Sequence, residues 1–104
     1  MPDMVIRELG SLDREALMVK MTRELPSISG KMGTTPLGII ERTGLDRERM
    51  GLVVSGKRKM KWSEYLSILF VLWDDEKGQE LVEERGLFPE VLRRAMSVNR
   101  NAHI

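Results

Sequence analysis

Apolar residues recur at helical spacing along most of this chain, and glycine, proline or aspartate interrupts the pattern at several points. Leu17, Met21 and Leu25 stand four residues apart, which predicts an amphipathic helix over residues 12–25. Pro26 is expected to end this helix, because proline lacks the amide hydrogen that a helix interior needs.

The residues on either side of this first helix predict less regular structure. Residues 26–33 are rich in turn formers and predict a loop, although Ile28 and Met32 are expected to join the core. Residues 1–10 could begin a helix, form a short edge strand or exchange with a partner subunit, on the strength of three apolar residues, Val5, Ile6 and Leu9. Gly10 punctuates them, and Ser11 is a candidate helix cap.

Two short helices separated by a tight turn are predicted between residues 35 and 56. Thr35 is suited to the N-cap and Pro36 to the first turn of a helix over residues 36–43. Gly44 ends that helix, since glycine adopts the left-handed conformation without a Cβ clash. Leu45 is an apolar plug between the two helices. The second helix is predicted over residues 47–55, with Asp46 as its cap and Gly56 as its closing glycine. Met50 and Val53 lie three residues apart on its buried side.

Residues 62–73 form the most apolar segment and predict a fourth helix. This helix is apolar over much more than one stripe, so it is either central to the core or shared with a second subunit, and both can hold. Its longest apolar run, residues 68–73, falls far short of the roughly 20 residues that a membrane-spanning helix needs.

The C-terminal third predicts two more helices. Asp74 and Asp75 can cap a fifth helix that runs through Glu84 and ends at Gly86. Pro89 then opens a last helix with an apolar stripe at Val91, Leu92, Ala95 and Met96, and residues 99–104 are expected to fray. The whole pattern predicts one all-α domain over residues 1–104, a compact bundle of five or six helices, with residues 74–98 completing the core or forming a dimer contact.

Composition narrows the chemistry. Cysteine is absent and His103 is the only histidine, so we expect no metal, no other cofactor and no disulfide. Neither a nucleophile motif nor a phosphate-binding glycine loop is visible, so we do not expect an enzyme. The N-terminal nine residues mix charged with apolar side chains, unlike a signal peptide, and we expect an intracellular, cytoplasmic protein that does not enter a membrane.

Charge is locally concentrated although the formal net charge is only +1. Within fifteen residues stand six cations, opposed only by Asp46 and Glu48: Arg47, Arg49, Lys57, Arg58, Lys59 and Lys61. Such a cluster on its own is more often a solvated surface than a binding site. Any affinity for nucleic acid must come from this local patch, because the whole chain is not a polycation.

The tight-turn segment resembles the XRE-type (lambda repressor and Cro-like) helix-turn-helix family. The resemblance rests on the spacing of Gly44 and Gly56, on the SGKRK run from Ser55 to Lys59 and on four apolar positions, Ile39, Leu45, Met50 and Val53. It covers residues 12–73 and places a lambda-repressor-like helix-turn-helix at about residues 35–56. It implies a transcriptional regulator that binds double-stranded DNA as a homodimer, with half-sites about one helical turn apart.

The resemblance also implies roles for individual residues. Side chains at the start of the second helix of the motif would contact bases: Arg47, Glu48, Arg49, Gly51 and Leu52. Phosphate contacts would come from Thr35, Ser55, Lys57, Arg58 and Lys59. Glu48 has an alternative role, in surface ion pairs with neighbouring arginines.

Two alternative functions stay open. XRE-type domains also serve as antitoxins, which would add a toxin to the partners of this chain. The other alternative is a protein-interaction module that has lost base readout, which is suggested by Pro36, Ile40 and the apolar run from Leu52 to Val54. Exposure of that run next to other apolar surface would favour this alternative.

Overall fold

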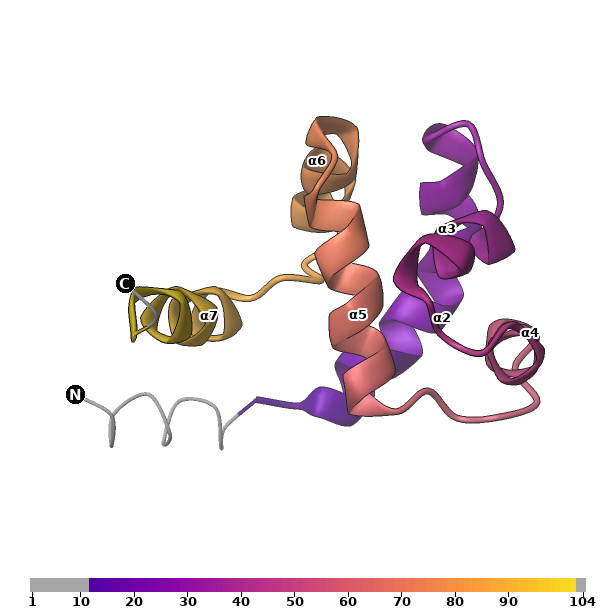
Figure 1. The fold of residues 1–104 in the computed structure, drawn as a ribbon, viewed down its shortest axis with the longest axis horizontal. Coiled ribbons are helices and arrows are strands. Elements are labelled where there is room, and N and C mark those ends of the chain that lie inside the picture. Colours follow the sequence, from indigo (N-terminus) through magenta and orange to yellow (C-terminus); the bar gives the residue numbers. More distant parts are fainter. Residues whose placement is uncertain (1–11, 103–104) are drawn as a thin grey trace. The chain divides into compact units, whose positions relative to one another are not determined.

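The computed structural model describes the backbone of residues 12–102 and the side chains of residues 12–96. Within that part of the chain all regular structure is helical, which confirms the predicted all-α class (Figure 1). The helices are α2 (Arg14–Lys31), α3 (Pro36–Thr43), α4 (Arg47–Val54), α5 (Trp62–Trp73), α6 (Glu76–Glu84) and α7 (Glu90–Ala102). The expectations for residues 1–11 and for the last two residues lie outside the described part.

The chain divides into two units. One is Arg14–Leu87, which holds α2 to α6, and the other combines Phe88–Ile104 with the N-terminal residues up to Asp13. Each unit is described by itself below. The assignment of a single domain to the whole chain stays a prediction.

Helix α2 is longer than the sequence predicts, because it continues through Pro26 to Lys31. The predicted stop at Pro26 and the predicted loop over residues 26–33 are therefore wrong; the turn begins only at Met32. Proline in a helix interior costs about 3 kcal/mol, but Leu25 and Ile28 on the same side are fully buried, and their burial offsets that cost. Ile28 is in the core as predicted, whereas Met32 is half-buried.

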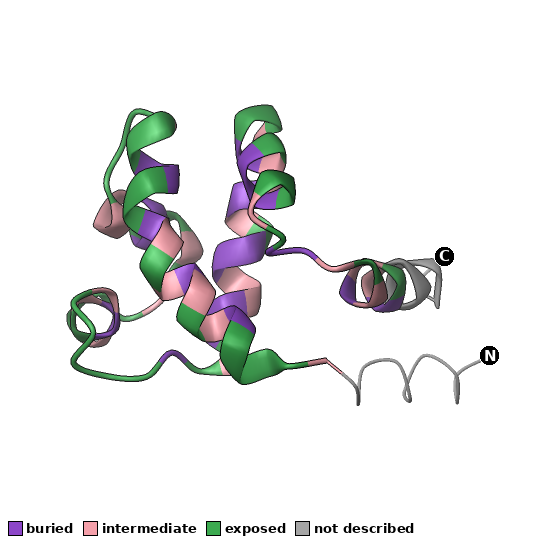
Figure 2. Ribbon diagram, turned by 180° about the vertical axis from the view of Figure 1, so that it is seen from behind, coloured by how far each residue is buried: buried purple, intermediate pink, exposed green. Residues whose placement is uncertain are grey.

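Helix α5 packs against α2, α3 and α6, and α2 contacts all four of the other helices in the unit Arg14–Leu87. Its bounds are those predicted from the sequence. Buried positions run along one side of the helices (Figure 2), and those of α5 are Glu64, Tyr65, Ile68, Leu69 and Leu72. The hydroxyl of Tyr65 donates a hydrogen bond to the carbonyl of Leu87, and burial raises the pKa of this phenol well above its usual range.

Helix α6 is held against both α5 and α2. Asp75 caps it, as predicted, by accepting hydrogen bonds from the amides of Lys77 and Gly78. Gly78 is buried, and a Cβ atom there would collide with the carbonyl of Leu72. The start of α6 therefore packs against the end of α5 more closely than any residue other than glycine permits. At the other end, Lys20 Nζ of α2 donates to the carbonyl of Arg85 at 3.1 Å.

The second unit contains α7. This helix begins one residue later than predicted, at Glu90, with the carbonyl of Pro89 accepting from the amides of Leu92 and Arg93. The Arg93 guanidinium lies 5.0 Å from the centre of the Phe88 ring. Helical backbone extends to Ala102, so the fraying expected from residue 99 is not seen up to that point.

Candidate nucleic-acid interface

Thr35 at the start of α3, and Gly44 and Asp46 in the turn between α3 and α4, act as the sequence predicts. Thr35 Oγ1 accepts from the amide of Gly38 at 3.1 Å, which caps α3. Gly44 ends α3 in the left-handed conformation at φ 77°. Asp46 then caps α4 by accepting from the amide of Glu48 at 3.3 Å. These caps fix where α4 begins and therefore which of its sides faces outward.

One side of α4 is buried and the opposite side is open. Met50 and Val53 are fully buried, as predicted. Because an α-helix turns 100° per residue, the side away from them carries Glu48, Gly51, Leu52 and Ser55, which we call the α4 outer strip. Leu52 is 37% exposed, and a Cβ added to Gly51 would meet no atom within 4 Å. The strip thus offers one carboxylate, one hydroxyl and one apolar side chain to an approaching partner.

The two arginines of α4 lie at the edges of this strip and are engaged with carboxylates of other helices. Arg47 Nη1 lies 3.0 Å from Glu41 of α3, in a pair whose side chains are both largely exposed. Arg49 binds Glu64 of α5 with two hydrogen bonds, at 2.7 Å from Nε and 3.1 Å from Nη2. Exposed pairs of the first kind are weak, so Arg47 can turn to another partner, whereas the forked pair holds Arg49 in place.

Glu64 receives a third hydrogen bond, from the amide of Lys61 at 2.7 Å. Its side chain is only 7% exposed, and burial by itself would raise its pKa. The hydrogen bonds from Arg49 and from the Lys61 amide, together with the positive charges of the Arg49 and Lys61 side chains, outweigh burial and hold the pKa of this carboxyl below its usual value. The same hydrogen bond raises the pKa of Arg49, so both groups are charged when the pair forms.

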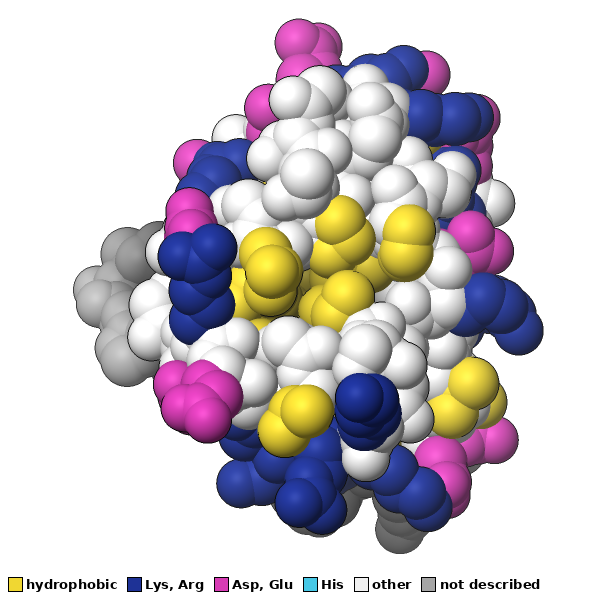
Figure 3. Space-filling model, turned by 90° about the vertical axis from the view of Figure 1, so that its right-hand side faces the viewer, with side chains coloured by type: hydrophobic (Ala, Val, Ile, Leu, Met, Phe, Trp, Pro, Cys, Tyr) yellow, Lys and Arg dark blue, Asp and Glu magenta, His cyan; other side chains and the backbone are white. Residues whose placement is uncertain are grey.

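The segment after α4 carries four exposed cations and no acid; we call Lys57–Lys61 the cationic loop. Gly56, directly before the loop, is in the left-handed conformation, and the amide of Lys57 donates to the carbonyl of Leu52 at 2.9 Å. Met60 anchors the loop, being 6% exposed. On the face that holds α3 and α4, Lys and Arg side chains gather along the lower edge, where this loop runs, below a group of apolar side chains (Figure 3).

The predicted phosphate contacts differ in what their side chains are free to donate. Lys57 and Arg58 are exposed, and Lys59 Nζ lies 3.6 Å from Glu15 in a pair that is almost fully solvated. Thr35 Oγ1 acts as an acceptor in its cap, which leaves its hydroxyl hydrogen free for an anion. Ser55 instead donates to the carbonyl of Leu52 at 3.0 Å, so its hydroxyl must rotate before it can donate to a phosphate.

The predicted base contacts are similarly divided. Glu48, Gly51 and Leu52 share the outer strip, and Arg47 adjoins it, whereas Arg49 points to α5 and also donates from Nη2 to the carbonyl of Lys59 at 3.1 Å. This geometry favours a structural role for Arg49. Val53 is core, so the run from Leu52 to Val54 is not one exposed apolar surface, and that argument for an interaction module is weakened.

Trp62 follows the cationic loop directly, and its ring contacts Tyr65 and Arg14. It stacks on Tyr65 with ring centres 4.9 Å apart and planes 9° apart. The guanidinium of Arg14 lies 5.3 Å from the Trp62 ring centre. The ring therefore connects the start of α2 to the start of α5, which is a structural role.

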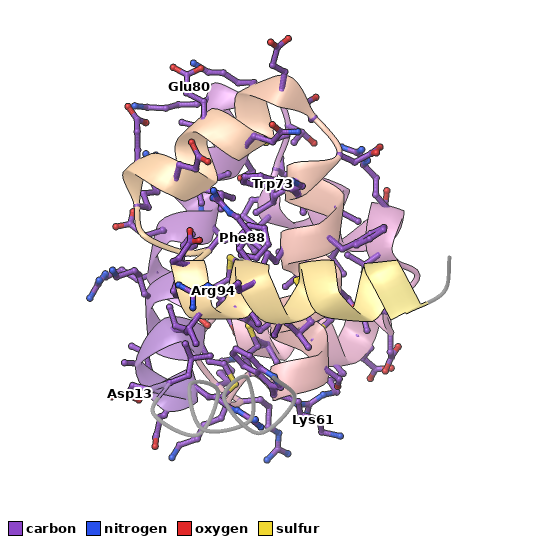
Figure 4. All side chains as sticks on the ribbon, turned by 90° about the vertical axis from the view of Figure 1, so that its left-hand side faces the viewer. Asp13, Lys61, Trp73, Glu80, Phe88 and Arg94 are labelled. Carbon is purple, nitrogen blue, oxygen red and sulfur yellow. The ribbon has the colours of Figure 1, made fainter. Side chains whose placement is uncertain are left out.

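Charge of opposite sign lies beyond the other end of α5. Residues 74–85 hold six acids and only two cations, Lys77 and Arg85: the acids are Asp74, Asp75, Glu76, Glu80, Glu83 and Glu84. Figure 4 shows Lys61 and Glu80 at opposite ends of the α5–α6 pair. The segments that flank α5 on its two sides thus carry charges of opposite sign, which a net charge near zero conceals.

Sequence reasoning missed Glu64, which accepts three hydrogen bonds. Its spacing was a usable signal, since a glutamate three residues after the residue that precedes a helix often accepts that residue's amide hydrogen. Its second partner, Arg49, lies on another helix 15 residues earlier, and no local pattern connects the two. Among the described residues no cluster of three or more His, Cys, Asp or Glu could hold a metal. In the same part of the chain, no helix combines the length and apolarity needed to cross a membrane.

Comparison with protein-family models, with curated proteins and with solved structures finds no match to this chain. The resemblance to XRE-type regulators therefore stays a prediction. The proposal of a function below rests on the geometry of α3, α4 and the cationic loop.

Proposed function

We propose that this protein is a non-enzymatic, cytoplasmic regulator of transcription that binds specific sequences of double-stranded DNA as a homodimer. The observation that carries the proposal is the position of the cationic loop beside the α4 outer strip. A helix that exposes a narrow side, reached through a tight turn and followed by exposed cations, is the arrangement with which helix-turn-helix proteins enter a major groove. Cations beside such a helix hold phosphates, and the helix itself meets base edges.

The proposed contacts follow from what each side chain has free. Lys57, Arg58 and Lys59 bind phosphates, with the Thr35 hydroxyl as a further donor at the start of α3. Within the strip, a carboxylate such as that of Glu48 can accept from a cytosine amino group, and Leu52 can contact a thymine methyl. Arg47 can reach a guanine only by leaving Glu41, and Arg49 is assigned to holding the structure together.

Charge separation supports this orientation. A polyanion attracts the end of the molecule that carries the cationic loop and repels the end that carries α6, so encounters are biased toward the proposed contact. The near-neutral chain then binds DNA through one surface only, and affinity should depend on few phosphate contacts.

The test is a fluorescence-anisotropy titration with random-sequence duplex DNA at several salt concentrations. Two variants remove one positive charge each: Lys57→Ala in the cationic loop, and Lys77→Ala on α6, where Lys77 Nζ lies 3.8 Å from Glu80. If Lys57 contacts a phosphate, Lys57→Ala weakens binding and lowers the slope of log affinity against log salt by about one unit. Lys77→Ala leaves both quantities nearly as they are in the wild type.

Equal weakening by the two variants would indicate only a general charge effect, without the proposed surface. Absence of binding at low salt would overturn the proposal and return attention to a protein partner. If the loop is confirmed, selection from a randomised duplex pool should enrich a pseudo-palindromic site, because a two-fold dimer presents two α4 helices to one side of the DNA. Enrichment of no sequence would leave a non-specific binder.

A further inference from the structure

A buried carboxylate lies directly beneath the cationic loop. Glu64 is an acid with 7% of its side chain exposed, and it sits where the loop joins α5. An anion at a surface that is meant to bind an anion weakens attraction by simple Coulomb repulsion. Its position therefore calls for a role other than charge.

The bonds around Glu64 connect three segments of the chain. The carboxylate accepts from Arg49 of α4 and from the backbone of Lys61, at the end of the loop. Arg49 in turn donates to the carbonyl of Lys59 within the loop. One ion pair thus holds the backbone at Lys59 and at Lys61 to α4 and α5.

Only the backbone of the loop is held in this way, while its side chains stay outside. Lys57, Arg58 and Lys59 are exposed, and Met60 between them and α5 is buried. A loop whose backbone is already ordered loses less conformational freedom when its cations bind phosphates. Ordering the loop in advance should therefore raise affinity.

We propose that the Arg49–Glu64 pair positions the cationic loop, so that a buried anion is required for tight binding of a polyanion. Glu64 and Arg49 are positioning residues here, and neither touches the DNA. The proposal rests on the DNA-binding function proposed above. Its structural half, the ordering of the loop by the pair, can be measured without DNA.

Charge alone predicts the opposite result, which makes the experiment sharp. Glu64→Gln removes one negative charge and should tighten DNA binding if only electrostatics matters. If the pair orders the loop, the same change weakens binding by about fivefold or more, since ordering even one flexible side chain on binding costs a factor of that size. Glu15→Gln is the matched control, because Glu15 meets only the side chain of Lys59 at the surface.

We expect Glu15→Gln to tighten binding or to leave it within about twofold of the wild type, as exposed pairs contribute little. Arg49→Lys is a second variant that keeps every charge but cannot form the same forked bonds to Glu64 and the bond to Lys59. It should weaken binding in the same direction as Glu64→Gln. Tightening by Glu64→Gln would overturn the proposal.

Limited trypsin digestion measures loop order directly, because the loop consists largely of trypsin sites. The bond after Lys59 is the most informative, since Arg49 holds its carbonyl. Cleavage there should be faster in Glu64→Gln and Arg49→Lys than in the wild type and in Glu15→Gln. Cleavage after Arg42, inside α3, reports opening of the whole unit and should rise much less.

The outcomes separate the two proposals. A wild type that does not bind DNA overturns the proposed function, while the cleavage rates still test the positioning of the loop. Unchanged cleavage after Lys59 in both variants contradicts the positioning even if DNA is bound. Parallel acceleration after Arg42 and Lys59, or loss of the helical circular-dichroism signal in both variants, would also contradict it, because the pair would then support the whole fold.

Discussion

Gly51 lies in the interior of α4 although no neighbouring atom requires a glycine there. A Cβ at this position would meet nothing within 4 Å, and its φ is not among the positive values of the chain. Glycine inside a helix costs about 0.5–1 kcal/mol relative to alanine. The fold gains nothing from that cost. A binding partner that approaches the α4 backbone closely would explain a glycine at this position.

This account predicts that Gly51→Ala raises stability and lowers affinity. The free energy of unfolding should increase by about 0.5–1 kcal/mol, because alanine fits the helix without strain. Affinity for duplex DNA should fall, because a methyl group then stands between the helix and the bases. Urea denaturation and fluorescence anisotropy measure the two effects on the same preparation.

Gly30→Ala is the matched control for that experiment. Gly30 is also helical, and a Cβ there would likewise meet nothing within 4 Å, but it lies near the end of α2 rather than on the outer strip. It should gain stability with unchanged affinity. A Gly51→Ala protein that binds as well as Gly30→Ala would show that nothing approaches α4 closely.

Single residues were predictable from the sequence when their role is local. The caps at Thr35, Asp46 and Asp75 each bond an amide two or three residues away, so the residue type and its place next to a helix were enough. Arg49 looked like a free cation because its partner Glu64 lies on another helix. Which arginine is held in place and which can turn to another partner depends on the packing of α4 against α5, and the sequence does not contain that information locally.

Among the elements, α2 is where local chemistry and packing disagree. Pro26 lies in the interior of its 18 residues and cannot donate to the carbonyl of Thr22. The helix persists because Ile28 and Ser29, beyond the proline, are fully buried. Ser29 adds a local bond, since its hydroxyl donates to the carbonyl of Leu25 at 2.8 Å.

Replacement of Pro26 should therefore stabilise the protein. Pro26→Ala restores the missing amide at an exposed position, and we expect the free energy of unfolding to rise by about 1–3 kcal/mol. Pro36→Ala is the control, because a proline in the first turn of α3 costs almost nothing. Urea midpoints of the two variants measure the difference. A destabilised Pro26→Ala would mean that the proline sets a bend that the core needs.

The other helices of the unit Arg14–Leu87 follow from the sequence with little error. Helices α3, α4, α5 and α6 begin and end within a residue of the predicted bounds. Capping side chains or left-handed glycines mark the ends of α3, α4 and α6, and a largely apolar run marks α5. The close approach of α6 to α5 at Gly78 was not predicted, since it depends on the position of a carbonyl in the preceding helix. Apolar periodicity thus predicts the helices, whereas the contacts between helices depend on their three-dimensional packing.

At the scale of the molecule, a second copy of the chain is the proposed partner of α5. Phe70 is 68% exposed, more than the other large apolar side chains among the described residues. Ser63 and Ser67 share its side of the helix, and the Ser67 hydroxyl is satisfied by the carbonyl of Ser63 at 2.9 Å. Two α5 helices that pack through this side would each bury the Phe70 side chain.

Phe70→Ser should therefore weaken the dimer by about tenfold or more, because a central aromatic side chain dominates such contacts. Sedimentation equilibrium at micromolar concentration measures the change in mass. Val19→Ser removes another exposed apolar side chain, on α2, and should leave the mass unchanged. A wild type that sediments as a monomer would exclude this homodimer, and equal effects of both variants would place its contact elsewhere.

The stack of Arg14, Trp62 and Tyr65 gives the protein a spectroscopic reporter of its own. Indole emission depends on nearby charge and solvent, and Trp62 is bonded directly to the last residue of the cationic loop. The only other tryptophan is Trp73, at the far end of α5. With Trp73 replaced by phenylalanine, the emission wavelength and intensity of Trp62 alone would report changes in the loop without any added label. The same signal could be recorded in salt titrations and in stopped-flow experiments.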